Sequence, residues 1–353
     1  MTNLNFKIAK KLKFIQMKTR FVSLLAMILF LLIQTACINK VQENKTEPQS
    51  TVKTTERQAE KAYVTKRINK CIELLEKGQP IYYQGAYGGY EEGKKLADTW
   101  ADYIMYNMEH NPLDFNALKE FMRALVENGP MASGHRTPTV IASMPVLGLD
   151  GPTMRANGWM IEQALACGVH GIHLARARNP EAVIEYIRAA RYPIHKQAED
   201  VLGVGFRGYG SQKFAAWVWG ISEEEYLKKA DVWPLNPDGE LMMGAKIEDP
   251  EALENAEETL KIPGLCFAEH GPRDMGLSYG HLEGRADPPL PPEVDAAGQK
   301  VLNLCKAYHL FFLDNVLPDN VEQKLEWGVM IGAGSNKEAA TKGRKYTKRE
   351  MPW

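Results

Sequence analysis

Residues 242–274, MMGAKIEDPEALENAEETLKIPGLCFAEHGPRD, contain the alternation that decides the fold. The apolar run Met242–Ile247 has the length of a buried strand, and Leu265–Ala268 is a second run of the same kind. Between them, Pro250–Lys261 has a helical pattern, and Asp249 precedes its first residue, a proline, as a helix cap typically does. The order strand, helix, strand indicates a βα unit of an α/β protein.

The same alternation recurs along the rest of the chain. Helical patterns cover Tyr63–Lys77, Asp114–Glu127, Trp159–Cys167, Pro180–Ala190 and Pro292–Tyr308. With the two runs above, the strand candidates number eight, the others being Ile81–Gln84, Asp102–Asn107, Thr139–Met144, Gly171–Leu174, His309–Leu313 and Gly328–Gly332. Eight strands separated by helices predict a TIM (β/α)₈ barrel. A doubly wound sheet is the alternative, and no phosphate-binding pattern GxxxxGKS/T supports it.

Composition describes an ordinary globular protein. The chain has 353 residues, 43 Lys and Arg against 44 Asp and Glu, and 44% hydrophobic residues. The near-zero net charge gives no reason to expect nucleic-acid binding. No CxxC pair occurs among the five cysteines, which disfavours a zinc ribbon or a thioredoxin-like site. Four of them, Cys71, Cys167, Cys266 and Cys305, lie in apolar or helical contexts and are expected to be buried thiols.

The N-terminal 58 residues differ from the rest of the chain. Residues 1–20 are basic and contain no acid, an apolar run 21–33 follows, and small residues precede Cys37, which is typical of a secretory signal over residues 1–37. The apolar run is shorter than the roughly 18–20 residues that span a bilayer. Cys37 fits the lipobox of a lipoprotein, with an ordinary signal peptide as the alternative. Residues 38–58 are polar and predict a disordered linker, so the barrel domain is expected over 59–353.

Polar groups follow three of the predicted strands, where an apolar core does not need them. Glu109 and His110 follow one strand, and Glu248-Asp249 follow another. The third strand runs into the segment 269–274, EHGPRD, which ends in Asp274. In a barrel, these strand ends meet at one face, where active sites form. Two carboxylates on neighbouring strand ends, with a histidine nearby, suit a hard divalent cation whose other ligands are waters. The alternative is that each residue only caps the helix that follows it.

These motifs combine in a recognisable order. One unit consists of a strand ending in Glu248, a proline-containing helix, and a strand ending in Gly-Pro-x-Asp at 271–274. Five other motifs occur in the chain: Glu109-His110, ACGVHGI at 166–172, RAARYP at 188–193, GFRG at 205–208 and GVMIGAG at 328–334. In this combination the chain resembles the HpcH/HpaI aldolase/citrate lyase family over roughly residues 60–340. The resemblance implies a barrel enzyme, a class II aldolase that acts as a carbon–carbon lyase.

The family resemblance also implies roles for individual residues. Glu248 and Asp274 would bind Mg²⁺, Mn²⁺ or Co²⁺, which polarises the 2-oxo group of pyruvate or a related acid. The backbone around Gly271 and Pro272 would receive the substrate carboxylate, Arg207 would lie in a loop near the mouth, and His110 would work in acid–base chemistry. The expected reaction cleaves a 4-hydroxy-2-oxo acid into a 2-oxo acid and an aldehyde, in a homo-oligomer.

Three positions depart from the family pattern. Asn107 stands where the family has an Asp that orients the histidine, the segment Ile141–Pro145 lacks the arginine that grips pyruvate, and Lys246 replaces a common Gln. Lys246 and Glu248 project to the same side of a strand because the period is two. We expect the Lys246 ammonium to replace the missing arginine; an inert salt bridge that displaces the metal and a Schiff-base lysine are the alternatives.

Other functions stay open on the sequence alone. The missing arginine and aspartate also suit an exported barrel that binds a carboxylated ligand without turnover, or an enzyme of altered chemistry on another oxo acid. The segment Phe214–Trp219 is expected to form an aromatic loop, at a pocket wall or a subunit contact. Arg176 and Arg178 would bind an acidic substrate tail or lie in a solvated loop. The basic tail from Lys342 onward is expected to be a solvated helix end.

Overall fold

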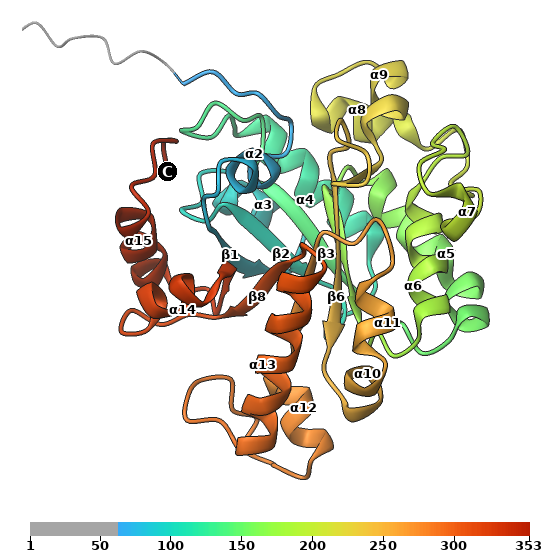
Figure 1. Ribbon diagram of the computed structural model, residues 1–353. Coiled ribbons are helices and arrows are strands. Elements are labelled where there is room, and N and C mark those ends of the chain that lie inside the picture. The colour runs from blue at the N-terminus through green and yellow to red at the C-terminus, as the bar shows by residue number, and fades with distance from the viewer. Residues whose placement is uncertain (1–62) are drawn as a thin grey trace, which may run out of the picture. The chain divides into compact units, whose positions relative to one another are not determined.

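Eight parallel strands form a closed barrel in the computed structural model, which describes residues 63–353 (Figure 1). The strands are β1 (Ile81–Ala86), β2 (Tyr103–Asn107), β3 (Thr139–Leu147), β4 (Gly171–Ala175), β6 (Leu241–Ile247), β7 (Phe267–His270), β8 (Phe311–Asn315) and β9 (Val329–Ala333). Each pairs with the next in this order, and β1 pairs with β9, which closes the barrel. The two-residue strand β5 (Val232–Trp233) adds to β6. The predicted (β/α)₈ barrel is confirmed.

Helices connect the strands and cover the outside of the barrel. They are α3 (Tyr90–Leu96), α4 (Phe115–Glu127), α5 (Gly151–Ala166), α6 (Pro180–Ala190), α7 (Glu199–Leu202), α8 (Gln212–Trp219), α9 (Glu223–Lys229), α10 (Pro250–Glu254), α11 (Ala256–Leu260), α12 (Pro272–Ser278), α13 (Pro292–Ala307), α14 (Val321–Trp327) and α15 (Lys337–Tyr346). Side-chain caps explain several starts. Asp114, Asp150 and Asp249 each accept a hydrogen bond from an amide in the first turn that follows.

The barrel has an apolar lower interior and a polar upper one. Side chains such as Tyr103, Ile141, Met242 and Phe267 fill the part nearest the N-terminal ends of the strands. The ring of Phe267 occupies the space beside Gly244, where any Cβ would overlap it. Further along the same strands the inward positions carry polar groups, so the apolar filling ends just below the face at which barrel active sites lie.

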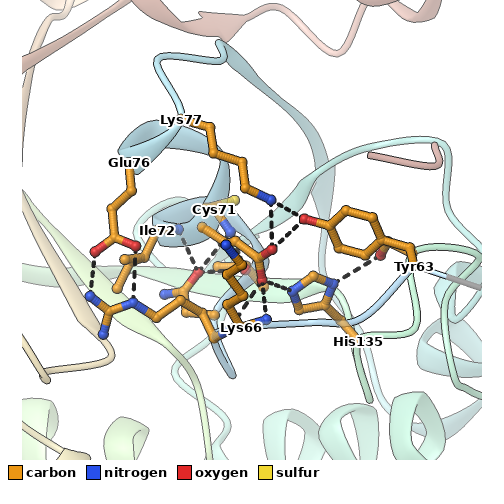
Figure 2. Close-up of polar contacts among 12 residues, drawn as sticks. Tyr63, Lys66, Cys71, Ile72, Glu76, Lys77 and His135 are labelled. Atoms are coloured by element: carbon orange, nitrogen blue, oxygen red, sulfur yellow. Dashed lines mark hydrogen bonds and ion pairs between the residues drawn. The ribbon is translucent and has the colours of Figure 1, made fainter. Parts of the chain in front are cut away.

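Helix α2 (Lys70–Glu76) lies at the N-terminal end of the barrel, on the side opposite α12 (Figure 1). The sequence predicted this helix from Tyr63, and that start is wrong. The Glu73 carboxylate accepts hydrogen bonds from the backbone amides of Lys66 and Arg67, at 2.8 and 3.1 Å, so those amides are not available to a helix. Figure 2 shows Tyr63, Lys77 and His135 directed at the same carboxylate.

Two further expectations are corrected. The segment Phe214–Trp219 is helical and belongs to α8, and the predicted helix Pro250–Lys261 is two helices that meet at Asn255. The four cysteines 71, 167, 266 and 305 are free and buried, as predicted. None of the helices within residues 63–353 combines the length and apolar character needed to cross a membrane. The predicted signal segment 1–37, with Cys37, and the linker 38–58 lie outside the described residues.

Candidate functional site

A cavity of about 370 Å³ opens at the carboxyl ends of the barrel strands. Six of the seven site residues predicted from the sequence line it: His110, Lys246, Glu248, Gly271, Pro272 and Asp274. Tyr83, Glu269, Arg273 and Asp314 also line it. Four carboxyl groups therefore face the cavity against the two cations Lys246 and Arg273. This acidic excess sets the electrostatics of the site.

Glu248 lies just beyond the end of β6 and is buried. Its Oε1 accepts a hydrogen bond from the backbone amide of Arg176 at 2.9 Å. A Cβ at Gly271 would lie 2.6 Å from the Glu248 Cβ and 2.8 Å from its Oε2, so only glycine allows this close approach. Burial raises the pKa of Glu248 to about 7; the Lys246 ammonium opposes the shift, and the carboxylates of Glu109 and Glu269 add to it.

Asp274 lies in the first turn of α12, immediately after the β7 strand end. Arg176 connects it to Glu248, because its guanidinium Nη2 is 3.4 Å from Asp274 Oδ1 while its amide binds Glu248. Arg176 has a left-handed backbone with φ of 47°, which costs free energy for a residue other than glycine and is common at functional sites. Arg178 instead pairs with Asp249 at 2.9 Å, outside the cavity lining.

Lys246 lies on β6, and its Nζ is 2.6 Å from Glu109 Oε2. Burial by itself lowers the pKa of this lysine, but Glu269, Glu248 and Glu109 surround the ammonium and raise the pKa above its ordinary value. Lys246 therefore stays protonated. Its direct partner is Glu109, and not the Glu248–Asp274 pair considered from the sequence.

Glu269 and His173 form an inner layer of the site, and neither was among the site residues predicted from the sequence. Strand register places Glu269 of β7 beside Lys246 of β6. Burial raises the pKa of Glu269 to about 7, with Lys246 opposing the shift. His173, on β4, is fully buried with Nε2 3.4 Å from Glu269 Oε2, and neither ring nitrogen has a hydrogen-bond partner among residues 63–353. Glu269 directly follows the predicted strand Leu265–Ala268, and this position, with the spacing of two residues from Phe267, is the signal that could have found it.

His110 follows β2 and has a 63% exposed side chain, with Nε2 3.6 Å from Glu109 Oε1. Glu109 thus contacts His110 with one oxygen and Lys246 with the other. The Asn107 side chain does not reach the imidazole in the role expected from the sequence. Its Oδ1 accepts hydrogen bonds from the backbone amides of Glu109 and His110 at 3.0 and 3.1 Å, and so fixes the turn that carries both residues.

Arg207 is the predicted site residue that the structure does not bring to the cavity. Its side chain is buried on the outside of the barrel, where Nη2 donates to the Tyr226 hydroxyl at 2.7 Å and the guanidinium lies 4.6 Å from the centre of the Tyr192 ring. The string GVGFRG at 203–208 has the spacing of a dinucleotide fingerprint, but it joins α7 to α8 and follows no strand. Arg207 therefore has a packing role, which corrects its predicted place near the mouth.

The residues present fit a divalent cation, although they would supply only part of its ligands. Among residues 63–353 there is no group of three or more His, Cys, Asp and Glu side chains arranged to hold a metal. Glu248 and Asp274 nevertheless lie at adjoining strand ends in a cavity with an excess of buried carboxylates. Mg²⁺ commonly takes one or two carboxylates and completes its coordination with water and substrate oxygens.

Comparisons with known proteins agree with this architecture. No family model matches the chain. A 2-keto-3-deoxy-L-rhamnonate aldolase from Klebsiella pneumoniae is 25% identical over 232 residues, which cover 66% of this chain and 73% of the relative. An HpcH/HpaI aldolase/citrate lyase family protein from Burkholderia cenocepacia has TM-score 0.57 and 20% identity, and the match covers 79% of this chain and 97% of that protein. An HpcH/HpaI aldolase from Desulfitobacterium hafniense has TM-score 0.55 and 19% identity, and the match covers 80% of this chain and 97% of that protein.

Proposed function

The chain belongs to the HpcH/HpaI aldolase/citrate lyase family, and from this premise we propose that it is a metal-dependent aldolase. Its reaction cleaves a 4-hydroxy-2-oxo acid into pyruvate, or a similar 2-oxo acid, and an aldehyde. The observation that supports this most directly is the shared cavity of Glu248, Asp274, Lys246 and His110 at the carboxyl face of the barrel. The name of the relative, an aldolase of a 2-oxo sugar acid, is consistent with the same bond cleavage.

Glu248 and Asp274 are the residues that would hold the cation, Mg²⁺, Mn²⁺ or Co²⁺. A bound divalent cation supplies Lewis-acid polarisation of the 2-oxo group. The raised pKa of Glu248 is consistent with this role, because a buried carboxylate whose charge is only partly compensated is stabilised by a cation beside it. Arg176 holds both carboxylates in place through its amide and its guanidinium.

Positive charge for the substrate carboxylate comes from Lys246 and Arg273, which both line the cavity. No arginine is present on β3, where Ile141 and Ser143 face inward. Lys246 therefore takes over the charge of the missing arginine, with Glu109 holding the ammonium in position. The backbone around Gly271 and Pro272, which also line the cavity, would contact the same carboxylate. A Schiff base is disfavoured, because a lysine kept protonated by three carboxylates is a poor nucleophile.

Proton transfer falls to His110. When the C3–C4 bond of the substrate breaks, the proton of the 4-hydroxyl group moves to His110 Nε2 and the electron pair of the bond moves onto C3 and the adjoining oxo group. The aldehyde leaves, and the proton is then returned to C3 to give the 2-oxo acid. Glu109 Oε1, 3.6 Å from Nε2, stabilises the imidazolium in the place of the absent aspartate.

The test is release of pyruvate by the full-length protein from a panel of 4-hydroxy-2-oxo acids, each with Mg²⁺, Mn²⁺ or Co²⁺. We expect metal-dependent release that Asp274→Asn lowers by about a hundredfold or more. The matched control is Asp319→Asn, an exposed aspartate outside the cavity, which should keep full activity. Release that is unaffected by a chelator would contradict metal dependence.

A second candidate function is a barrel that binds a carboxylated ligand without turnover. The Arg176–Asp274 ion pair favours it, because a guanidinium already neutralises one proposed metal ligand. No pyruvate from any substrate, together with retained binding of a 2-oxo acid, would support this candidate. Export, lipid attachment at Cys37 and assembly into a homo-oligomer stay predictions from the sequence.

A further inference from the structure

A second group of buried charges lies at the other end of the barrel. Asp102, directly before β2, is fully buried and pairs with three cations. Lys70 Nζ is 3.3 Å, Arg344 Nη2 3.0 Å and Arg349 Nη1 2.7 Å from its oxygens. All three cationic side chains are at most 2% exposed. One buried carboxylate thus faces three buried basic side chains, and the two guanidinium groups alone exceed its charge.

The cations also have unused hydrogen-bonding capacity. The Nε atoms of Arg344 and Arg349 are buried and have no hydrogen-bond partner among residues 63–353. Burial lowers the pKa of Lys70; Asp102 opposes the shift, while Arg344 and Arg349 add to it. Buried polar and charged groups are normally satisfied, so an incompletely paired cationic cluster indicates a ligand that carries negative charge.

A cleft of about 550 Å³ lies against this cluster, between α15, the segment after α3 and the C-terminal residues. Lys70 and Arg344 line it together with Lys95 and Lys337, against the single acid Asp98. Lys95 has one partner, Glu92 at 3.0 Å. Thr99, Ser133 and Thr341 also line the cleft, with their hydroxyl groups already hydrogen-bonded within the protein. Trp100 and Trp353 add apolar walls. The lining therefore combines cations with aromatic surface.

We propose that this cleft binds the phosphate group of a small metabolite. Four basic side chains against one acid in the lining suit a dianion, and guanidinium and ammonium groups are usual partners of phosphate oxygens. The volume exceeds that of a bare phosphate, and the tryptophan walls would contact the organic part. Thr99 and Trp100 lie in the connection from α3 to β2, at the N-terminal ends of the strands, so the site is separate from the cavity of Glu248.

The experiment is calorimetric titration of the full-length protein with inorganic phosphate, then with glycerol 3-phosphate, and with succinate as a dicarboxylate. Phosphate should bind, and glycerol 3-phosphate should bind more tightly. Arg344 and Lys70 also support the fold, so the variants change the exposed cations Lys95 and Lys337. The double variant Lys95→Ala/Lys337→Ala should weaken binding about tenfold, since each exposed ion pair contributes up to about fivefold. Lys342→Ala, on the same helix but outside the cleft, should change it less than about twofold.

Three outcomes with the parent protein and the double variant would overturn the proposal. The first is that neither inorganic phosphate nor glycerol 3-phosphate binds at millimolar concentration. The second is that the double variant and the parent bind with equal affinity. The third is that succinate binds as tightly as glycerol 3-phosphate. The readout is binding, so a failure of the proposed aldolase reaction would leave this test unaffected. If Lys342→Ala weakened phosphate binding as much as the double variant does, the anion would bind elsewhere on α15. That result would also contradict the proposal.

Discussion

Buried carboxylates at the two ends of the barrel behave in opposite ways. At the carboxyl face, burial dominates, and the pKa values of Glu248 and Glu269 are raised to about 7. At the N-terminal end, burial also raises the pKa of Glu73, but Lys77, Tyr63 and two backbone amides outweigh it and hold the pKa near 2. The difference lies in the partners, because each buried carboxylate takes the ionisation state that its neighbours stabilise. Satisfied carboxylates maintain the fold, whereas underpaired ones in a cavity are available for binding and chemistry.

The largest expected effect is at the carboxyl face. Glu248→Gln keeps the hydrogen bond from the Arg176 amide but removes the charge. We expect the rate of pyruvate release to fall about a thousandfold. The melting temperature should not fall, because the raised pKa means that the ionised form of Glu248 destabilises the fold at neutral pH. The two measurements are kcat/KM and thermal unfolding. A large drop in melting temperature would show that Glu248 stabilises the fold as Glu73 does. The two ends of the barrel would then not differ in this respect.

The next effect is at the N-terminal end. Asp102→Asn leaves Lys70, Arg344 and Arg349 buried without their common anion. We expect the free energy of unfolding to fall by about 3 kcal/mol, as when one partner of a buried ion pair is removed. Urea denaturation measures this, and Asp98→Asn, an exposed aspartate nearby, is the control. Activity per folded molecule should stay unchanged, and a specific loss of activity would show that the two ends are coupled.

The smallest effect concerns pH. The pKa of Glu73 is about 2 in the folded protein and 4.5 ordinarily, so its carboxylate contributes stability at pH above 4.5. That contribution decreases as the pH falls from 4.5 towards 2. The free energy of unfolding should therefore fall more steeply across this window in the parent than in Glu73→Gln. Urea titrations at several pH values measure the two slopes, and parallel slopes would show that Glu73 is not held ionised.

Much of the fold could be predicted because strands and helices alternate clearly along the chain. All eight barrel strands were located within a few residues. The helix start at Lys70 was missed because the prediction followed periodicity, whereas the start is set by Asn69, whose side chain caps the amides of Cys71 and Ile72. Local periodicity contains no information about such a contact.

The candidate site was predictable where it depends on strand ends and hidden where it depends on the barrel interior. Glu248 and Asp274 follow apolar runs, and that position is visible in the sequence. His173 lies within a predicted strand, and its proximity to Glu269 follows only from strand register and closure of the barrel. Arg207 failed as a prediction because a motif gives no information about whether its side chain reaches the cavity or packs against Tyr226.

The packing of the Phe267 ring against Gly244 limits which substitutions can be accepted at these two positions during evolution. Positions 244 and 267 cannot vary independently, since a larger side chain at one requires a smaller one at the other. A relative with alanine or valine at 244 should therefore have lost the aromatic ring at 267. Single replacement of Gly244 would disturb β7 directly beneath Glu269, and a compensating change of Phe267 should restore it.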